Sequence, residues 1–367
     1  MKKVLTLVVC VMLVSCIVVF AACSNSAAPA ADTTTEAPAA AEEPAAAGAS
    51  EYAGDYEITT VVKLIGIGWF DRMEEGLKEF ADETGNTTSM LGPPQADAAL
   101  QNQILEDLIA QQVDAISVVP FSPEACEPVL KKAMDAGIVV IGHEADNLVN
   151  CDYDIEAFNN YAYGQDLGAL LAEAMGGEGK YITTVGSVTS KSQNQWEEGG
   201  VDYNAENNPG MELVERKLET QDEQKKAQEI MVEMLKKYPD LKGFQGATSQ
   251  DAPGAAQAVE DAGLIGKVFV VGTTMPSISS KYLENGSLYA MACWDPAQAG
   301  KAMDALAVLC LDGRRDEIGP GLALGYEGYN DIQLNEMTEV TENPERYLEG
   351  SAMIVIKNVE EMAQYPF

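Results

Sequence analysis

The chain has 367 residues, of which 23 are Lys or Arg and 58 are Asp or Glu, so its formal net charge is −35. A surface this acidic repels a phosphate backbone, which argues against nucleic acid as a partner. Apolar residues make up 46% and charged residues 22%, as in soluble globular proteins. The length predicts two folded units, or one large unit with a leader. The single histidine, His143, excludes a multi-histidine zinc site.

The N-terminus has the pattern of a bacterial export signal. A basic start precedes the apolar run 4–20, and two alanines precede Cys23. This pattern predicts a lipoprotein signal peptide over residues 1–22, with cleavage before Cys23 and a lipid on its thiol. Phe20 stands where a leucine is usual, and Cys16 fits the letters of the motif but is followed by more apolar residues. An uncleaved anchor helix is the alternative.

The next segment is predicted to be a tether. Residues 24–50 are rich in Ala, Pro and Thr and contain no basic and no aromatic residue. Such a composition cannot bury enough apolar area to offset the entropy of ordering. We therefore expect residues 23–54 to consist of the lipid-anchor cysteine and a disordered tether.

Cysteine spacing supports neither a redox motif nor a zinc knuckle. Four cysteines follow Cys23, with no C-x-x-C spacing among them. Because an exported protein can keep a disulfide, Cys126 and Cys151 form a candidate pair. The alternative is that all four are small buried hydrophobic residues.

From residue 56 onward, short β-branched runs alternate with segments of helical period. We predict strands at 58–64, 115–119, 138–141, 180–185, 212–218, 244–247 and 268–271, and helices at 73–84, 98–112, 124–136, 161–175, 195–207, 222–238 and 254–262. This alternation implies right-handed crossovers and parallel sheets covered on both faces. Because the rhythm restarts after residue 145, we expect an α/β protein with two doubly wound lobes.

No motif in the chain predicts catalysis. Gly66 and Gly68 open like a dinucleotide fingerprint, but Asp71 stands where its third glycine would be. Neither a G-x-S-x-G elbow nor a phosphate-binding loop occurs, and the pair His143-Glu144 has no second histidine for a zinc protease motif. We therefore predict a protein that is not an enzyme and needs no cofactor and no metal.

Ligands of open parallel sheets bind beyond the carboxyl ends of the strands. The residues there combine carboxylates, amides and hydroxyls with aromatic rings, a mixture that suits small polyols, since an aromatic face covers the C–H side of a sugar ring. Ordinary loop polarity, or core packing for the tryptophans, is the alternative. The residues are Lys63, Trp69, Phe70, Glu144, Ser187, Ser192, Gln193, Asn194, Ser249, Gln250, Thr274, Trp294 and Asp295.

Four ordered motifs carry a family resemblance: KLIGIGWF at 63–70, SQNQW at 192–196, APGAAQA at 252–258 and WDPAQAG at 294–300. Together they resemble the autoinducer-2 and rhamnose-binding branch of the type I periplasmic binding proteins, the solute receptors of bacterial ABC importers. The resemblance implies two Rossmann-like lobes joined by a three-strand hinge, with crossings near 143–147, 293–296 and 325–330. The implied N-terminal lobe comprises 55–145 plus 294–325, and the implied C-terminal lobe comprises 146–293 plus 326–367.

The resemblance also implies which residues contact the ligand. The family's lysine and glutamine fall on Lys63 and Gln193, while its two aspartates fall on Glu144 and Ser192, so that the second change removes a charge. The predicted ligand-binding residues are Lys63, Trp69, Phe70, His143, Glu144, Ser192, Gln193, Ala247, Ser249, Thr274 and Trp294, with Ala247 and Ser249 in place of the family's proline and alanine.

The expected function follows from the resemblance. It implies a monomeric receptor, held by lipid at the outer face of the cytoplasmic membrane, that delivers autoinducer-2, rhamnose or a related polyol to an ABC permease. A membrane-tethered sensor that presents its liganded form to a signalling partner is the alternative. Sugar-responsive repressors share these lobes, but they carry a DNA-binding segment where this chain has an export signal.

Overall fold

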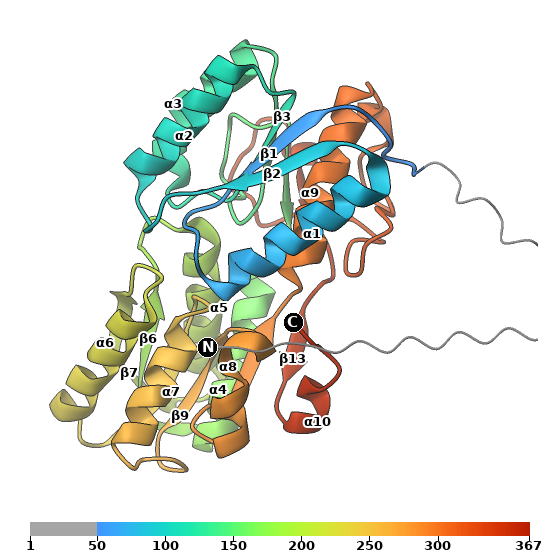
Figure 1. The fold of residues 1–367 in the computed structure, drawn as a ribbon. Coiled ribbons are helices and arrows are strands. Elements are labelled where there is room, and N and C mark those ends of the chain that lie inside the picture. The colour runs from blue at the N-terminus through green and yellow to red at the C-terminus, as the bar shows by residue number, and fades with distance from the viewer. Residues whose placement is uncertain (1–49) are drawn as a thin grey trace, which may run out of the picture. The chain divides into compact units, whose positions relative to one another are not determined.

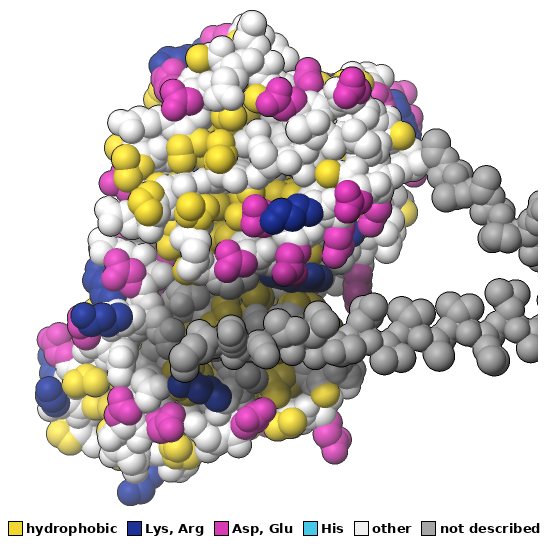
Figure 2. All heavy atoms as spheres, in the orientation of Figure 1, with side chains coloured by type: hydrophobic (Ala, Val, Ile, Leu, Met, Phe, Trp, Pro, Cys, Tyr) yellow, Lys and Arg dark blue, Asp and Glu magenta, His cyan; other side chains and the backbone are white. Residues whose placement is uncertain are grey.

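The computed structural model describes residues 50–367. The predicted signal peptide, Cys23 and nearly all of the predicted tether lie outside the described residues. Among the helices that are described, none combines the length and the apolar character needed to cross a bilayer. Figure 2 shows acidic side chains spread over the face in view and interspersed with basic ones.

The N-terminal lobe is built on a seven-stranded sheet in the order β11-β12-β5-β4-β3-β1-β2. All neighbours are parallel except β11, which runs antiparallel to β12. Helix α1 packs on α9, and α2 packs on α3 (Figure 1). The strands are β1 Glu57–Val61, β2 Thr87–Leu91, β3 Ala115–Val118, β4 Val139–Gly142, β5 Tyr153–Glu156, β11 Gln333–Leu334 and β12 Tyr347–Glu349; the helices are α1 Gly68–Thr84, α2 Ala98–Gln111, α3 Pro123–Asp135, α9 Pro296–Leu311 and the short 3-10 turns Arg315–Glu317 and Pro344–Arg346.

The C-terminal lobe is built on a six-stranded sheet in the order β13-β10-β9-β8-β6-β7, parallel except for β13. Helix α4 packs on α5, and α6 packs on α7. The strands are β6 Glu178–Val185, β7 Gly210–Glu219, β8 Leu241–Gly246, β9 Phe269–Thr273, β10 Ala290–Cys293 and β13 Ile354–Ile356; the helices are α4 Asn160–Met175, α5 Lys191–Asn207, α6 Gln224–Lys237, α7 Asp251–Asp261, α8 Pro276–Asn285 and α10 Val359–Met362.

Both sheets follow the doubly wound order in which the second strand lies outside the first, so the order reverses beside β1 and beside β6. Ligands of such sheets bind at this point of reversal, beyond the carboxyl ends of the strands. The segments that leave β1 and β6 there are the ones that carry Lys63 and Gln193. The predicted fold of two doubly wound α/β lobes is confirmed.

Two pairs of helices that carry residues of the site, α1 with α9 and α4 with α5, pack closely at glycines. A Cβ added at Gly76 of α1 would lie 2.3 Å from the carbonyl oxygen of Ala297 on α9. A Cβ added at Gly164 of α4 would lie 2.2 Å from the carbonyl oxygen of Trp196 on α5. Glycine is therefore required at both positions, because any side chain would push the paired helices apart.

Two of the three predicted crossings between the lobes are wrong. Strands β5 and β12 pair in the N-terminal sheet, so the chain leaves that lobe between β5 and α4, and again between β12 and β13. The remaining crossing, between β10 and α9, lies where the sequence predicts it. Residues 146–156 and 333–349 thus belong to the N-terminal lobe. Strand β5 escaped prediction because it carries Asp154 and Glu156, both fully buried, in place of an apolar pattern.

Candidate functional site

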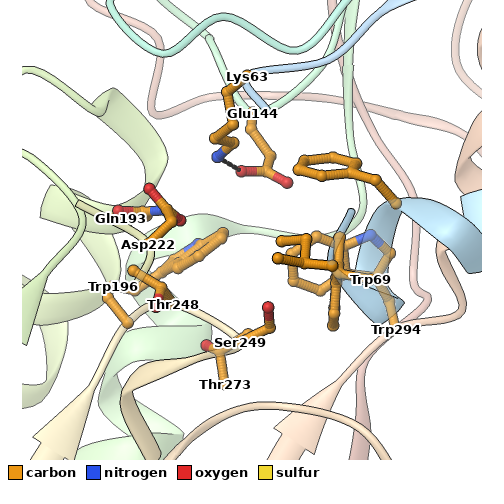
Figure 3. Close-up of a pocket in the computed structure, with 13 residues that line it drawn as sticks. Lys63, Trp69, Glu144, Gln193, Trp196, Asp222, Thr248, Ser249, Thr273 and Trp294 are labelled. Atoms are coloured by element: carbon orange, nitrogen blue, oxygen red, sulfur yellow. Dashed lines mark hydrogen bonds and ion pairs between the residues drawn. The ribbon is translucent and has the colours of Figure 1, made fainter. Parts of the chain in front are cut away.

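A cavity lies between the carboxyl edges of the two sheets (Figure 3). The two lobes are joined by a hydrogen bond in which the Ser190 hydroxyl donates to the carbonyl of Phe121 at 3.2 Å. Within residues 50–367, no group of three or more His, Cys, Asp or Glu side chains is placed to hold a metal ion. The cavity is lined by Lys63, Ile67, Trp69, Phe70, Glu144, Gln193, Trp196, Asp222, Ala247, Thr248, Ser249, Thr273 and Trp294.

The N-terminal lobe contributes a buried ion pair. The ammonium of Lys63, just after β1, lies 2.6 Å from a carboxylate oxygen of Glu144, just after β4, and both side chains are about 95% buried, with 4% and 5% exposed. Burial alone would lower the pKa of Lys63, but the charges of Glu144 and Asp222 outweigh it and raise that pKa. Lys63 therefore stays an ammonium and can donate to a ligand.

The C-terminal lobe contributes an amide and a second carboxylate. The Gly186 N–H donates to Oε1 of Gln193 at 2.8 Å, and Nε2 of Gln193 donates to Oδ1 of Asp222 at 3.4 Å. The other oxygen of Asp222, Oδ2, is buried without a hydrogen-bond partner in the protein. Burial raises the pKa of Asp222 to about 6.

Tryptophan rings form the apolar wall of the cavity. All three tryptophans of the chain line it, and each is at least 96% buried, with 4% or less exposed. The ring of Trp294 lies edge-on to Trp69, with centroids 4.6 Å apart, and 5.5 Å from Trp196. Trp196 is held by its indole N–H, which donates to Asn160 at 2.7 Å, whereas the buried indole nitrogen of Trp294 has no protein partner. The indole N–H of Trp294 is therefore available to donate a hydrogen bond to a ligand.

Eight of the eleven predicted ligand-binding residues line the cavity, and three do not. His143 is buried behind it, with its ring Nδ1 against the carbonyl of Ile155. The Ser192 hydroxyl donates to Glu156 at 3.1 Å, and the Thr274 hydroxyl donates to the carbonyl of Ser249 at 3.0 Å. Each of the three is a chain neighbour of a lining residue, and neighbouring side chains point in different directions.

Five lining residues were missed: Ile67, Trp196, Asp222, Thr248 and Thr273. The signal for Asp222 was its place directly after β7, the same strand-end position that pointed to Glu144. It was hidden because the predicted helix began at residue 222, two positions before α6 begins. Trp196 belongs to the SQNQW motif at 192–196 but was not among the predicted ligand-binding residues.

The predicted disulfide is wrong. Cys126 and Cys151 are both buried free thiols. The Cys126 thiol lies 3.8 Å from Oε1 of Gln101, and the Cys151 thiol lies 3.5 Å from the carbonyl of Leu148. Both pack into one apolar cluster of the N-terminal lobe, where burial raises the pKa of each thiol. They behave as small hydrophobic residues, which was the stated alternative.

Comparison with known proteins gives one family. Residues 58–315 match the family described as "Periplasmic binding protein domain". The chain is 26% identical over 260 residues to the D-allose-binding periplasmic protein of Escherichia coli, covering 69% of this chain and 81% of that one. It is 27% identical over 250 residues to the D-ribose/D-allose-binding protein of Pseudomonas aeruginosa, covering 64% and 76%.

Solved structures share the fold. LsrB from Clostridium saccharobutylicum in complex with AI-2 superposes with a TM-score of 0.78 at 19% identity, covering 85% of this chain and 100% of that one. An ABC transporter solute binding protein from Clostridium phytofermentas with bound L-rhamnose gives a TM-score of 0.75 at 21% identity, covering 86% and 99%. At such identities the likeness is one of fold, and it extends over both lobes.

Proposed function

The chain belongs to the periplasmic binding protein domain family, and from this premise we propose that it captures a small sugar or sugar-like ligand for an ABC importer. Because the family consists of binding proteins, the prediction that the chain is not an enzyme is confirmed. The proposed receptor is a monomer, anchored by lipid on Cys23, that passes its ligand to a membrane permease.

One observation carries the choice of ligand class. Hydrogen-bonding groups of the two lobes face each other across a small cavity walled by tryptophan, with Lys63 and Glu144 on one side and Gln193 and Asp222 on the other (Figure 3). The carboxylates can accept hydrogen bonds from paired hydroxyls, and the amide can both accept and donate. The indole faces can cover the C–H surface of a sugar ring.

The same arrangement supports closure as the mechanism of capture. A ligand that bonds to Lys63 of one lobe and Gln193 of the other has all its contacts only when the lobes are together. It therefore shifts the equilibrium between open and closed forms toward the closed form. A micromolar dissociation constant, worth about 8 kcal/mol, suits capture followed by release.

The ligand is identified by a binding screen of the protein against autoinducer-2, L-rhamnose, D-ribose, D-allose and D-galactose. The first four are chosen because proteins similar to this chain carry them in their names or structures. A ligand at 1,000 times its dissociation constant should add about 4 kcal/mol of stability, which a thermal shift detects. No shift with any of the five, in protein shown to be folded, would contradict the proposal.

Anchoring is tested separately on Cys23. In a bacterial host that processes lipoproteins, the protein should be found in the membrane fraction and take up labelled fatty acid. The variant Cys23→Ser should lose the label and no longer be cleaved at that site. Equal labelling of the two proteins would contradict the assignment of the anchor.

A further inference from the structure

We propose that Asp222 is the second carboxylate of the ligand site and accepts hydrogen bonds from an adjacent pair of hydroxyls on a neutral sugar. This inference rests on the proposed sugar-binding function and deepens it. It assigns to the C-terminal lobe a contact that matches that of Glu144 in the N-terminal lobe. It also identifies the chemical feature of the ligand that the site selects.

The backbone holds Asp222 in an unusual position. Asp222 and its neighbour Gln221 both have left-handed backbone angles, with φ of 55° and 58°. Such angles cost about 1–3 kcal/mol each for residues other than glycine and are concentrated at functional sites. Backbone bonds from Thr220 to Val185 and from Gln221 to Gly186, both 2.9 Å, fix this loop to the end of β6. The backbone angles and these two hydrogen bonds together fix the direction of the Asp222 side chain.

That direction leads into the cavity. Asp222 lines it with only 6% of its surface exposed. In Figure 3 the carboxylate lies beside Gln193 and faces the side of the cavity that holds Lys63 and Glu144. Space for it depends on Gly186, since a Cβ added there would lie 2.4 Å from Oδ2 of Asp222. No residue other than glycine at position 186 leaves the carboxylate where it is.

The carboxylate has bonding capacity that the protein does not use. An ionised carboxylate offers about four acceptor positions, and here a single long bond of 3.4 Å from Gln193 occupies one. A buried acceptor left without a partner is costly, so a ligand that donates to it recovers that cost on binding. Two neighbouring hydroxyls can donate to the two oxygens of one carboxylate, as a single hydroxyl or an ether cannot.

Charge defines the ligand class further. The charged groups that face Asp222 are Lys63 after β1, Glu144 after β4 and Asp251 on α7. Ionised Asp222 and Glu144 together outweigh the one ammonium that lines the cavity. A sugar acid would meet this excess of negative charge, whereas a neutral sugar would not.

The test compares Asp222→Asn with a matched control, Asp304→Asn, by calorimetric titration with whichever of the five sugars the protein binds. Asp304, on α9, is likewise fully buried with one unpartnered oxygen, but it lies in the core of the N-terminal lobe and not in the cavity. Asp222→Asn keeps the shape but replaces an acceptor with a donor, so the affinity should fall at least about tenfold. Asp304→Asn should bind as the unchanged protein does.

The dependence on pH gives an independent readout that needs no variant. Because burial places the pKa of Asp222 at about 6, affinity should rise as the pH increases from about 5 to about 7 and the carboxylate ionises. In Asp222→Asn this rise should disappear.

The outcomes separate two failures. If the protein binds a sugar but Asp222→Asn binds equally well, or if affinity is flat across this pH range, the role of Asp222 is overturned and the proposed function stands. If the unchanged protein binds none of the five ligands, the proposed function is contradicted, and the role of Asp222 is contradicted as well because it rests on that function.

Discussion

The two halves of the cavity are built on the same fold but treat their charges differently. In the N-terminal half, Lys63 and Glu144 satisfy each other at 2.6 Å with almost no exposure. In the C-terminal half, Asp222 has one long bond and one free oxygen. The charges of one half are thus already paired with each other, whereas the carboxylate of the other half keeps an oxygen without a partner in the protein.

Removing the ammonium of the N-terminal half should have the largest effect. Lys63→Met keeps most of the apolar stem but leaves Glu144 as a buried charge without its partner. We expect the free energy of unfolding to fall by about 3–5 kcal/mol, measured by urea denaturation at neutral pH. The double variant with Glu144→Gln should regain most of that loss.

The control for this prediction is an exposed ion pair. Lys131 and Asp135 lie 2.7 Å apart on α3, with 60% and 64% of their side chains exposed. Lys131→Met should change the free energy of unfolding by less than about 1 kcal/mol. Similar losses at Lys63 and Lys131 would mean that the buried pair stabilises the fold no more than an exposed pair does.

The C-terminal half should be sensitive to the packing of α4 on α5. Gly164→Ala places a Cβ 2.2 Å from the carbonyl oxygen of Trp196, so α5 must move and take Trp196 and Gln193 with it. We expect a loss of about 1–3 kcal/mol in stability and a weaker affinity for the sugar. Gly319→Ala, where nothing lies within 4 Å, should change stability by less than about 1 kcal/mol. Unchanged affinity in Gly164→Ala would show that α5 does not position the site.

Asp304, a buried acid outside the cavity, should make the stability of the protein depend on pH. Burial raises the pKa of Asp304 to about 7, from 3.8. An acid with a raised folded-state pKa contributes stability that is full below its unfolded pKa and is lost as the pH rises through the folded one. Asp304→Asn should therefore flatten the decline in stability between about pH 4 and pH 7, by at most about 1.4 kcal/mol per pH unit. An unchanged slope in chemical denaturation would contradict the assignment.

The smallest expected effect is optical. Because all three tryptophans line the cavity, a bound sugar should change the intrinsic fluorescence. Trp196 is on α5 with Gln193, which donates to Asp222 at the proposed ligand contact. Trp196→Phe should thus remove more of the signal than Trp69→Phe. Equal losses would mean that both halves respond alike.

The sequence was sufficient for most of the fold because parallel strands are continuous apolar runs that end abruptly. It failed where that pattern is absent. Strand β5 has two buried acids, and β2 alternates exposed with half-buried residues at the edge of its sheet. Of the two, β5 marks where the chain first leaves the N-terminal lobe, because the crossing to α4 follows it directly.

Strand ends located the site to within a residue but not the direction of each side chain. Lys63, Glu144 and Gln193 face the cavity, whereas His143 and Ser192, one position away, face the interior. Direction depends on local backbone angles such as the φ of 57° at Glu144, which no pattern of residue types reveals. That Oδ2 of Asp222 lacks a hydrogen-bond partner depends on neighbours distant in sequence, so it could not be predicted from the sequence either.

The late crossing between the lobes bears on how the chain folds. Strand β12 joins the N-terminal sheet beside β5, and the Tyr347 hydroxyl donates to the carbonyl of Leu148, 199 positions earlier. Helix α9, which packs on α1, also follows strands β6 to β10 of the C-terminal lobe in the sequence. The N-terminal lobe begins the folded chain, yet α9, β11 and β12 join it only after five of the six strands of the C-terminal sheet. Contacts of such separation slow folding, so the C-terminal lobe, largely contiguous, is expected to fold first and serve as the template.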